Sequence, residues 1–346
     1  MAISAFITGL AGTAISRDER TFLREALPWG LILFKRNIDT PAQVMALVND
    51  FRGLAGRADA PVLIDQEGGR VQRLGPPHWP VYPPGAAYGR LFDHDRALGL
   101  KAARLGTRLI AADLTALGIN VDCLPVADVP VAGADAVIGD RAYGHTPEKV
   151  AALAAAAAEG LLEGGVLPVV KHIPGHGRAT ADSHHKLPVV DTGRAILDAT
   201  DFEAFRKLAY LPLAMTAHVV FSAIDATAPA TTSATVIADV IRKGIGFQGL
   251  LMSDDMSMGA LSGSLAERTR AALKAGCDVA LHCNGKLEEM QQVVSGCSSL
   301  DGKAAARAEK ALCILKRPTD IDLAAARVEF RSMMDSQPAG AKATIV

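Results

Sequence analysis

Several features that define whole classes of protein are missing from this sequence, and cysteine pairing is the first. The chain of 346 residues has five cysteines, at positions 123, 277, 283, 297 and 313, and they form no C-x-x-C pair. An odd number at such spacing argues against a disulfide framework and a structural zinc motif, and it indicates a reducing compartment. We therefore expect a cytoplasmic protein.

A charge imbalance and a long apolar run are also missing. Lys and Arg number 36 and Asp and Glu number 37, so no polybasic surface for nucleic acid or anionic lipid is indicated. No apolar run reaches the roughly 18 residues that a membrane span needs. The apolar residues 1–12 lack the basic residues of a signal peptide and suit a first core strand. We expect a monomer with no nucleic-acid partner and no membrane partner.

Two catalytic signatures are absent as well. The dinucleotide-binding pattern G-x-G-x-x-G does not occur after the first apolar run, where the sequence is Gly9-Leu-Ala-Gly12. No G-x-S-x-G elbow follows any apolar run, which argues against a Ser-His-Asp triad. We expect an enzyme without a cofactor.

What the sequence does contain is a regular alternation of short apolar runs and helix-like segments. The eight apolar runs are Ala5–Leu10, Gly30–Phe34, Pro61–Ile64, Ile119–Leu124, Val166–Val170, Leu213–Val220, Gly249–Met252 and Asp278–Leu281. The helix-like segments between them are Ser16–Leu27, Pro41–Leu54, Arg96–Leu117, Pro147–Leu162, Ser233–Arg242 and Leu265–Ala275. This alternation predicts parallel strands covered by helices.

Eight repeats favour a closed (β/α)8 TIM barrel over an open, doubly wound sheet. After the eighth run about sixty residues remain, which is too few for a second domain of the usual size. They comprise an alanine-rich helical segment, Asp301–Leu315, and a polar tail. We therefore expect a single catalytic domain over residues 1–346, with 335–346 as a loosely ordered tail.

Polar residues gather just after the apolar runs, where barrel enzymes build their active sites. Asp65 and Arg73 follow the third run, and Arg141 follows the fourth. The fifth run leads into Lys171-His-Ile-Pro-Gly-His-Gly-Arg-Ala-Thr-Ala-Asp-Ser-His-His185, a glycine-containing loop crowded with titratable groups. Residues far apart in the sequence would thus converge on one mouth of the barrel.

Two adjacent carboxylates, Asp254 and Asp255, end the seventh run. Neighbouring residues on a strand point in opposite directions, so only one of the two should face the mouth. A carboxylate there could act as a nucleophile, a general base or a metal ligand. The alternative is a helix N-cap, because Asp is favoured at that position and a helix-like segment follows.

Asp182 and His184 flank Ser183 in the loop after the fifth run. An imidazole with an ordinary pKa near 6.5 can give and take a proton near neutrality, and a nearby carboxylate would fix its tautomer. The alternative is a solvated loop histidine, since D-x-H is a common spacing.

Two ligand types fit the remaining polar groups. His172, His176 and His184 could bind a transition metal, although Pro174-Gly175 interrupts the helix that would place His172 and His176 on one face. Arg73, Arg141 and Lys171 converging with Asp65 would instead suit a ligand with many hydroxyl groups. This leaves a metal-dependent hydrolase as an alternative to a carbohydrate enzyme.

Four motifs in order resemble the β-N-acetylhexosaminidases of glycoside hydrolase family 3, in particular the single-domain bacterial branch of peptidoglycan recycling. They are Asp65-Gln-Glu-Gly-Gly-Arg-Val-Gln-Arg73, Lys171-His-Ile-Pro-Gly-His-Gly177, Asp182-Ser-His184 and Ser253-Asp-Asp-Met-Ser-Met258. The match runs over residues 3–315. Many relatives carry a second domain that supplies a carboxylate acid/base, for which this chain has no room.

The resemblance implies retaining hydrolysis that releases a terminal, non-reducing N-acetylglucosamine from peptidoglycan fragments such as GlcNAc-1,6-anhydro-MurNAc and its peptides. It implies that Asp254 is the nucleophile and that His184, assisted by Asp182, is the acid/base. The sugar-binding residues that it implies are Asp65, Arg73, Arg141, Lys171 and His172, and no metal or cofactor is implied. Relatives with a histidine acid/base also raise the alternative of phosphorolysis. A catalytically silent sugar-binding barrel is a further alternative.

Overall fold

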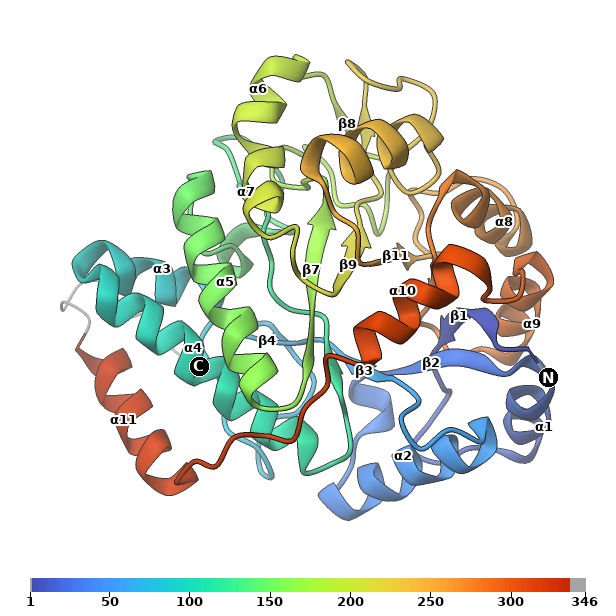
Figure 1. Cartoon of the computed structure of the whole chain (residues 1–346), viewed down its shortest axis with the longest axis horizontal. Coiled ribbons are helices and arrows are strands. Elements are labelled where there is room, and N and C mark those ends of the chain that lie inside the picture. The colour runs from blue at the N-terminus through green and yellow to red at the C-terminus, as the bar shows by residue number, and fades with distance from the viewer. Residues whose placement is uncertain (1, 337–346) are drawn as a thin grey trace.

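Eight parallel strands close into one barrel in the computed structural model, which describes residues 2–336 (Figure 1). The neighbours around the barrel run β1-β12-β11-β9-β7-β6-β3-β2 and back to β1. The strands are β1 (Ser4–Thr8), β2 (Pro28–Leu33), β3 (Val62–Ile64), β6 (Val121–Asp122), β7 (Leu167–Ile173), β9 (Leu213–Thr216), β11 (Leu250–Asp255) and β12 (Val279–His282). Each falls within or overlaps a predicted apolar run, so the TIM barrel is confirmed.

Helices surround this barrel (Figure 1). Those at predicted places are α1 (Arg17–Ala26), α2 (Pro41–Ala55), α4 (Arg96–Thr115), α5 (Pro147–Glu163), the π-helix η3 (Val236–Ile245), α8 (Leu265–Ala275) and α10 (Gly302–Leu312). Further helices, not predicted, are α3 (Gly85–His94), α6 (Arg194–Ala199), α7 (Asp201–Lys207), α9 (Leu287–Gly296) and α11 (Leu323–Asp335). Short 3-10 turns form η1 (Lys35–Asn37) and η2 (Gly139–Arg141).

Local sequence fixes where several of these helices begin. Both α2 and α5 start at a Thr-Pro pair, in which the Thr side chain caps the helix and Pro takes the first helical position. α1 begins with a capping box between Ser16 and Glu19. The beginnings of these helices therefore follow from the residues that satisfy their first backbone N–H groups.

Several strand boundaries differ from the prediction, and those of β7 and β9 differ in ways that bear on the site. The predicted strand Leu213–Val220 ends at Thr216, and β10 (Val220–Phe221) pairs with β8 (Val189–Val190) outside the barrel. A small antiparallel pair, β4 (Gln66–Gly68) and β5 (Val71–Gln72), follows β3. β7 extends beyond its apolar run to Ile173, so Lys171 and His172 lie on the strand itself.

The apolar core has two parts. One lies between the barrel and the surrounding helices, and the other fills the barrel with inward side chains such as Trp29, Leu167 and Met252. Ala308 and Ala311 of α10 join this inner cluster, and Arg307 binds Asp278 at the start of β12. α10 therefore closes the N-terminal end of the barrel and leaves the opposite end for the site.

The segment after α10 corrects the expectation of a polar tail. α11 packs on α4 and α3, with Ala326, Phe330 and Met333 buried on one face. Of the tail predicted at 335–346, Asp335 ends α11 and Ser336 follows it, while 337–346 lie outside the described residues. Between residues 2 and 336, no helix has the length and apolar character that crossing a bilayer requires.

Candidate active site

At the C-terminal ends of three strands, charged side chains lie next to the apolar side chains that fill the barrel. Side chains two residues apart on a strand face the same side. In β7 and β11, and just after β3, a charged residue stands two positions after a residue of the inner apolar cluster. The pairs are Leu63 and Asp65, Val169 and Lys171, and Met252 and Asp254. These three charged residues form the layer directly above the barrel core.

Two carboxylates and three cations form a buried network on one side of this layer. Lys171 Nζ lies 2.8 Å from Asp65 Oδ1 and 2.6 Å from Glu67 Oε1. Arg141 binds both oxygens of Glu67, at 2.8 and 2.9 Å, and Arg73 donates to Asp65 Oδ2 at 3.0 Å. The structure thus brings together four of the five predicted sugar-binding residues and adds Glu67, which was not predicted.

The charges of this network outweigh the effect of burial on its carboxylates. Burial alone raises the pKa of both acids, but Lys171 and Arg73 lower the pKa of Asp65, and Lys171 and Arg141 lower that of Glu67 to about 2. Burial alone would lower the pKa of Lys171, yet Asp65 and Glu67 raise it. All of these groups are therefore charged at neutral pH.

The N–H donors of this network that its own carboxylates do not use are the ones that could bind a ligand. An ammonium group has three N–H donors, and Asp65 and Glu67 use two of those on Lys171. Arg73 is the most accessible cation here, with 25% of its side chain exposed and its guanidinium 5.1 Å from the centre of the Phe34 ring. Arg141 is only 9% exposed and also donates to the Val137 carbonyl. Direct sugar contacts by these residues remain predictions.

Replacing Glu67 with glutamine should destabilise the fold by about 3 kcal/mol near neutrality, because it leaves buried Lys171 and Arg141 under-compensated. The pKa of Glu67 in the fold, about 2, lies below its ordinary 4.5, so its contribution is complete above pH 4.5 and disappears as the pH falls toward 2. Denaturant unfolding of both proteins across this range measures the difference.

The control for this prediction is Glu25→Gln, at an exposed position of α1. It should change the free energy of unfolding by less than about 0.5 kcal/mol. A gap between wild type and Glu67→Gln that stays constant from pH 7 to the acid limit of folding would contradict the ionised state of Glu67.

Asp254 and Asp255 have different surroundings. Both oxygens of Asp255 are occupied: Oδ1 accepts from the backbone N–H groups of Ser257 and Cys283, and Oδ2 accepts from Ser257 Oγ. Asp254 Oδ1 accepts only from the Asp255 N–H, at 2.8 Å, and Oδ2 has no hydrogen-bond partner in the described part of the chain. Asp255 therefore stabilises the turn, and Asp254 has an oxygen left for chemistry.

Two histidines that affect Asp254 are His172 on β7 and His218 just after β9. Burial would raise the pKa of this carboxyl, but the imidazoles of His218 and His172, the Asp255 N–H and His184 lower it. His218 Nε2 donates to the Asp255 carbonyl at 3.0 Å, and burial lowers the pKa of His218. Asp254 is thus held as a carboxylate in a pocket of imidazoles.

One buried carboxylate, Asp128, fixes the two histidines of β7 and the loop that follows. It accepts from His172 Nδ1 at 2.7 Å and from the backbone N–H of His176 at 2.6 Å. A carboxylate only accepts, so Nδ1 of His172 carries the proton, and its Nε2 is the nitrogen available to a ligand. Asp128 therefore sets the orientation of His172.

Asp182 and His184 form the predicted pair. Asp182 Oδ1 accepts from both the backbone N–H and Nδ1 of His184, at 2.9 and 2.7 Å. This contact leaves His184 Nε2 for proton transfer, and 59% of the His184 side chain is exposed. The His184 carbonyl accepts from the N–H of Gly259, five residues after Asp254, so the pair lies beside the segment that follows β11.

The three histidines of the metal hypothesis do not converge as a ligand set. Among the described residues, only His176 has its Nε2 occupied, 3.1 Å from Ser183 Oγ, whereas His172 and His184 use Nδ1 for Asp128 and Asp182, so the arrangement of the three side chains decides the question. Within residues 2–336, no group of three His, Cys, Asp or Glu side chains is arranged to hold a metal ion. The site residues therefore do not fit the metal centre of that alternative.

Glu67, Asp128 and His218 are not among the predicted site residues, although each contacts a predicted residue or its neighbour. Glu67 stands two positions after Asp65 in a polar segment. Asp128 follows the fourth apolar run and His218 lies within the sixth, so their positions place both near the mouth, but their partners come from other strands and their contacts do not follow from the sequence.

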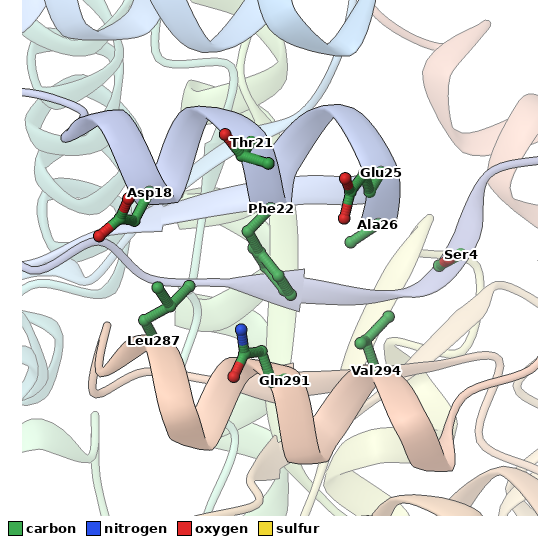
Figure 2. A pocket seen from close by; sticks show the side chains of 9 residues that line it. All are labelled: Ser4, Asp18, Thr21, Phe22, Glu25, Ala26, Leu287, Gln291 and Val294. Carbon is green, nitrogen blue, oxygen red and sulfur yellow. The ribbon is translucent and has the colours of Figure 1, made fainter.

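The surface also carries hollows away from this layer. Figure 2 shows a hollow between α1 and α9, where Phe22 points toward α9. Its volume is about 540 Å³, and none of the predicted site residues lines it. Another, of about 300 Å³, lies between the loops after β2 and β3 and is lined in part by Lys35, Gln72 and Arg73. The second hollow therefore borders the charged network.

Comparisons with known proteins identify the family of the chain. Residues 4–314 match the glycosyl hydrolase family 3 N-terminal domain. A beta-hexosaminidase of Alkalilimnicola ehrlichii is 40% identical over 288 residues, which are 82% of this chain and 82% of that protein. The crystal structure of NagZ from Neisseria gonorrhoeae in complex with N-trifluoroacetyl-D-glucosamine is 30% identical, with a TM-score of 0.83 and 97% of both chains covered.

A longer relative has the same barrel. The family 3 beta-N-acetylglucosaminidase of Paenibacillus sp. str. FPU-7 is 31% identical with a TM-score of 0.78, and the match covers 99% of this chain and 63% of that one. The predicted family and enzyme class are thereby confirmed. The chain belongs to glycosyl hydrolase family 3, and its enzymatic class is that of a beta-hexosaminidase.

Proposed function

We propose that the chain is a retaining exo-glycosidase that hydrolyses terminal, non-reducing β-N-acetylglucosamine from peptidoglycan fragments, including GlcNAc-1,6-anhydro-MurNAc and its peptides, in cell-wall recycling. The observation that carries this proposal is an ionised Asp254 with an unpartnered oxygen, in the same mouth as the Asp182–His184 pair. The sugar-analogue complex of the Neisseria enzyme supports the identity of the sugar.

In the first step, Asp254 attacks the anomeric carbon while protonated His184 gives its Nε2 proton to the departing glycosidic oxygen. The bond between the sugar and the leaving group breaks through an oxocarbenium-like state, and a glycosyl ester of Asp254 forms. The imidazoles around Asp254 keep it ionised and therefore nucleophilic.

In the second step, His184 acts as a base. Its Nε2 accepts a proton from water, whose oxygen attacks the anomeric carbon and releases the Asp254 carboxylate. Asp182 keeps the other proton on Nδ1 and stabilises the imidazolium of the resting acid. Two displacements return the sugar with its original β configuration.

The sugar's hydroxyl and N-acetyl groups bind to Asp65, Arg73, Arg141, Lys171 and His172 in this proposal. The ion pairs among the first four hold their donors and acceptors in fixed directions before the substrate arrives. His172 offers Nε2 from the side of Asp254. We place the reaction in the cytoplasm, which the five free thiols support. We also propose that the enzyme is a monomer, which a mass near 36.1 kDa by light scattering would support.

A substrate panel tests the proposal. We expect turnover of an aryl β-N-acetylglucosaminide, slower turnover of the β-galactosaminide and little turnover of the β-glucoside, with β-N-acetylglucosamine as the first product by NMR. Added phosphate should leave both the rate and the product unchanged. A sugar phosphate as product would replace hydrolysis with phosphorolysis, and an α-configured first product would exclude the two-step route.

A further inference from the structure

We propose that Ser183 is a positioning residue, which holds His184 in place for proton transfer by anchoring its loop to the buried side chain of His176. The inference rests on the proposed function, because it concerns the same acid/base. Ser183 is 3% exposed, whereas the side chains of Asp182 and His184 are 30% and 59% exposed. The middle residue of the D-x-H motif thus points into the protein while the pair that it separates faces the mouth.

The anchor beneath Ser183 is fixed by the core. Ser183 Oγ lies 3.1 Å from Nε2 of His176, which is itself 3% exposed. Asp128 accepts from the His176 backbone N–H at 2.6 Å, so the same buried carboxylate orients His172 and secures the base of the anchor. Gly177 supports this placement, because a Cβ there would lie 2.2 Å from the Val129 carbonyl oxygen.

The hydroxyl of Ser183 matters because His176 has little else to bind. Burial lowers the pKa of His176 to about 4, so the ring is neutral at neutral pH. Its Nδ1 has no hydrogen-bond partner among residues 2–336. Ser183 Oγ is therefore the one hydrogen-bond partner that the described residues give this ring.

Two backbone contacts connect the loop to the segment that carries Asp254. The carbonyl of Ser183 accepts from the N–H of Ala260 at 3.2 Å, and the carbonyl of His184 accepts from the N–H of Gly259 at 3.1 Å. Gly259 and Ala260 belong to the turn that follows β11, so the loop is docked beside the proposed nucleophile. A Cβ on residue 259 would lie only 3.0 Å from the His184 carbonyl oxygen, which accounts for glycine there.

The contacts separate the placement of His184 from its chemistry. The Asp182–His184 hydrogen bond lies wholly within the loop and does not involve Ser183 Oγ. Removing that hydroxyl leaves the pair intact but removes the side-chain contact between residue 183 and His176, while the backbone contacts of Ser183 and His184 to the Gly259–Ala260 turn remain. The acid then spends less time where the glycosidic oxygen is protonated.

The test is the dependence of kcat/KM on the leaving group in Ser183→Ala. For an alkyl β-N-acetylglucosaminide, which needs a proton to depart, we expect kcat/KM to fall about tenfold. For a dinitrophenyl glycoside, which departs without acid help, the fall should be less than about twofold. kcat/KM reports the steps up to the glycosyl-enzyme, so the later hydrolysis does not obscure the comparison.

Thr107→Val is the matched control, because Thr107 also makes a buried hydrogen bond, to the Ala157 carbonyl, far from the mouth. It should lower the thermal midpoint without changing the ratio of the two kcat/KM values. His176→Phe removes the anchor from the other side and should reproduce the altered ratio, and the double variant should add little to either single one.

The outcomes distinguish this inference from the proposed function. If the wild-type protein cleaves neither glycoside, the proposed function is wrong. If the wild type cleaves both and the Ser183→Ala and His176→Phe variants keep its ratio, or lose both activities equally, Ser183 does not position the acid and only the inference is overturned.

Discussion

Replacing Asp254 with alanine is expected to lower kcat/KM for an aryl β-N-acetylglucosaminide by about 10⁴-fold or more, since no other group replaces the attacking carboxylate. The loss should be similar for good and poor leaving groups, because both need the nucleophile. The fold should survive, because among residues 2–336 the Asp254 side chain accepts one hydrogen bond, from the adjacent Asp255 N–H.

Azide gives this prediction its specific readout. In Asp254→Ala, the small anion can occupy the space of the lost carboxylate and attack the anomeric carbon directly, which yields the α-glycosyl azide by a single inversion. A 5-fluoro sugar should correspondingly trap wild-type enzyme as an ester on the peptide that contains Asp254, which mass mapping detects.

Asp255→Ala is the matched control. It removes a carboxylate that binds Ser257 and Cys283, so it should lower stability and reduce the rate, but azide should not restore it. A trapped ester on Asp255, or azide rescue of Asp255→Ala alone, would show that the neighbouring carboxylate is the nucleophile.

Replacing His184 with alanine is expected to have the second large effect. For a substrate with a poor leaving group, kcat/KM should fall by about 10³-fold, whereas for a dinitrophenyl glycoside it should fall less than about tenfold, because the nitrophenolate leaves without a proton. Steady-state kcat/KM values for a series of aryl glycosides give the dependence of the rate on the pKa of the leaving group. The slope of that dependence separates the two cases.

His185→Ala is the control for His184. This side chain is adjacent and 84% exposed, and its only charged contact in the described residues is at 4.0 Å from Asp182. It should leave the slope unchanged. If His184→Ala lowered kcat/KM equally for all leaving groups, His184 would not be the acid and would instead be a binding residue.

The barrel and most of its mouth were predictable from the sequence for one physical reason. Parallel strands buried on both faces require continuous apolar residues, so a charge at the end of such a run is conspicuous. Asp65, Lys171 and Asp254 all stand out in this way. In the sequence, only the family resemblance distinguishes Asp254 from Asp255 as the nucleophile. In the structure, the occupied oxygens of Asp255 support the same choice independently.

The parts that could not be predicted depend on contacts between distant segments. α3 contains two glycines, which weaken its helical signal, yet Gly85 and Gly89 are required where the helix approaches the carbonyls of Arg141 and Tyr143. α11 buries only Ala326, Phe330 and Met333, an apolar face too short to stand out in the sequence. Glu67 and Asp128 gain their importance only from partners on β7 and η2.

The closed barrel also has a consequence for how the chain is made. β1 needs β12 as its second neighbour, and the inner cluster needs Ala308 and Ala311 beneath it. While the ribosome is still synthesising the first 280 residues, β1 therefore has one unpaired edge. The N-terminal end of the barrel stays uncovered for about thirty residues longer, until α10 has been made. Such distant pairing makes closure slow relative to local helix formation. The nascent chain must keep an incomplete sheet from pairing with other chains until about its last fifth emerges.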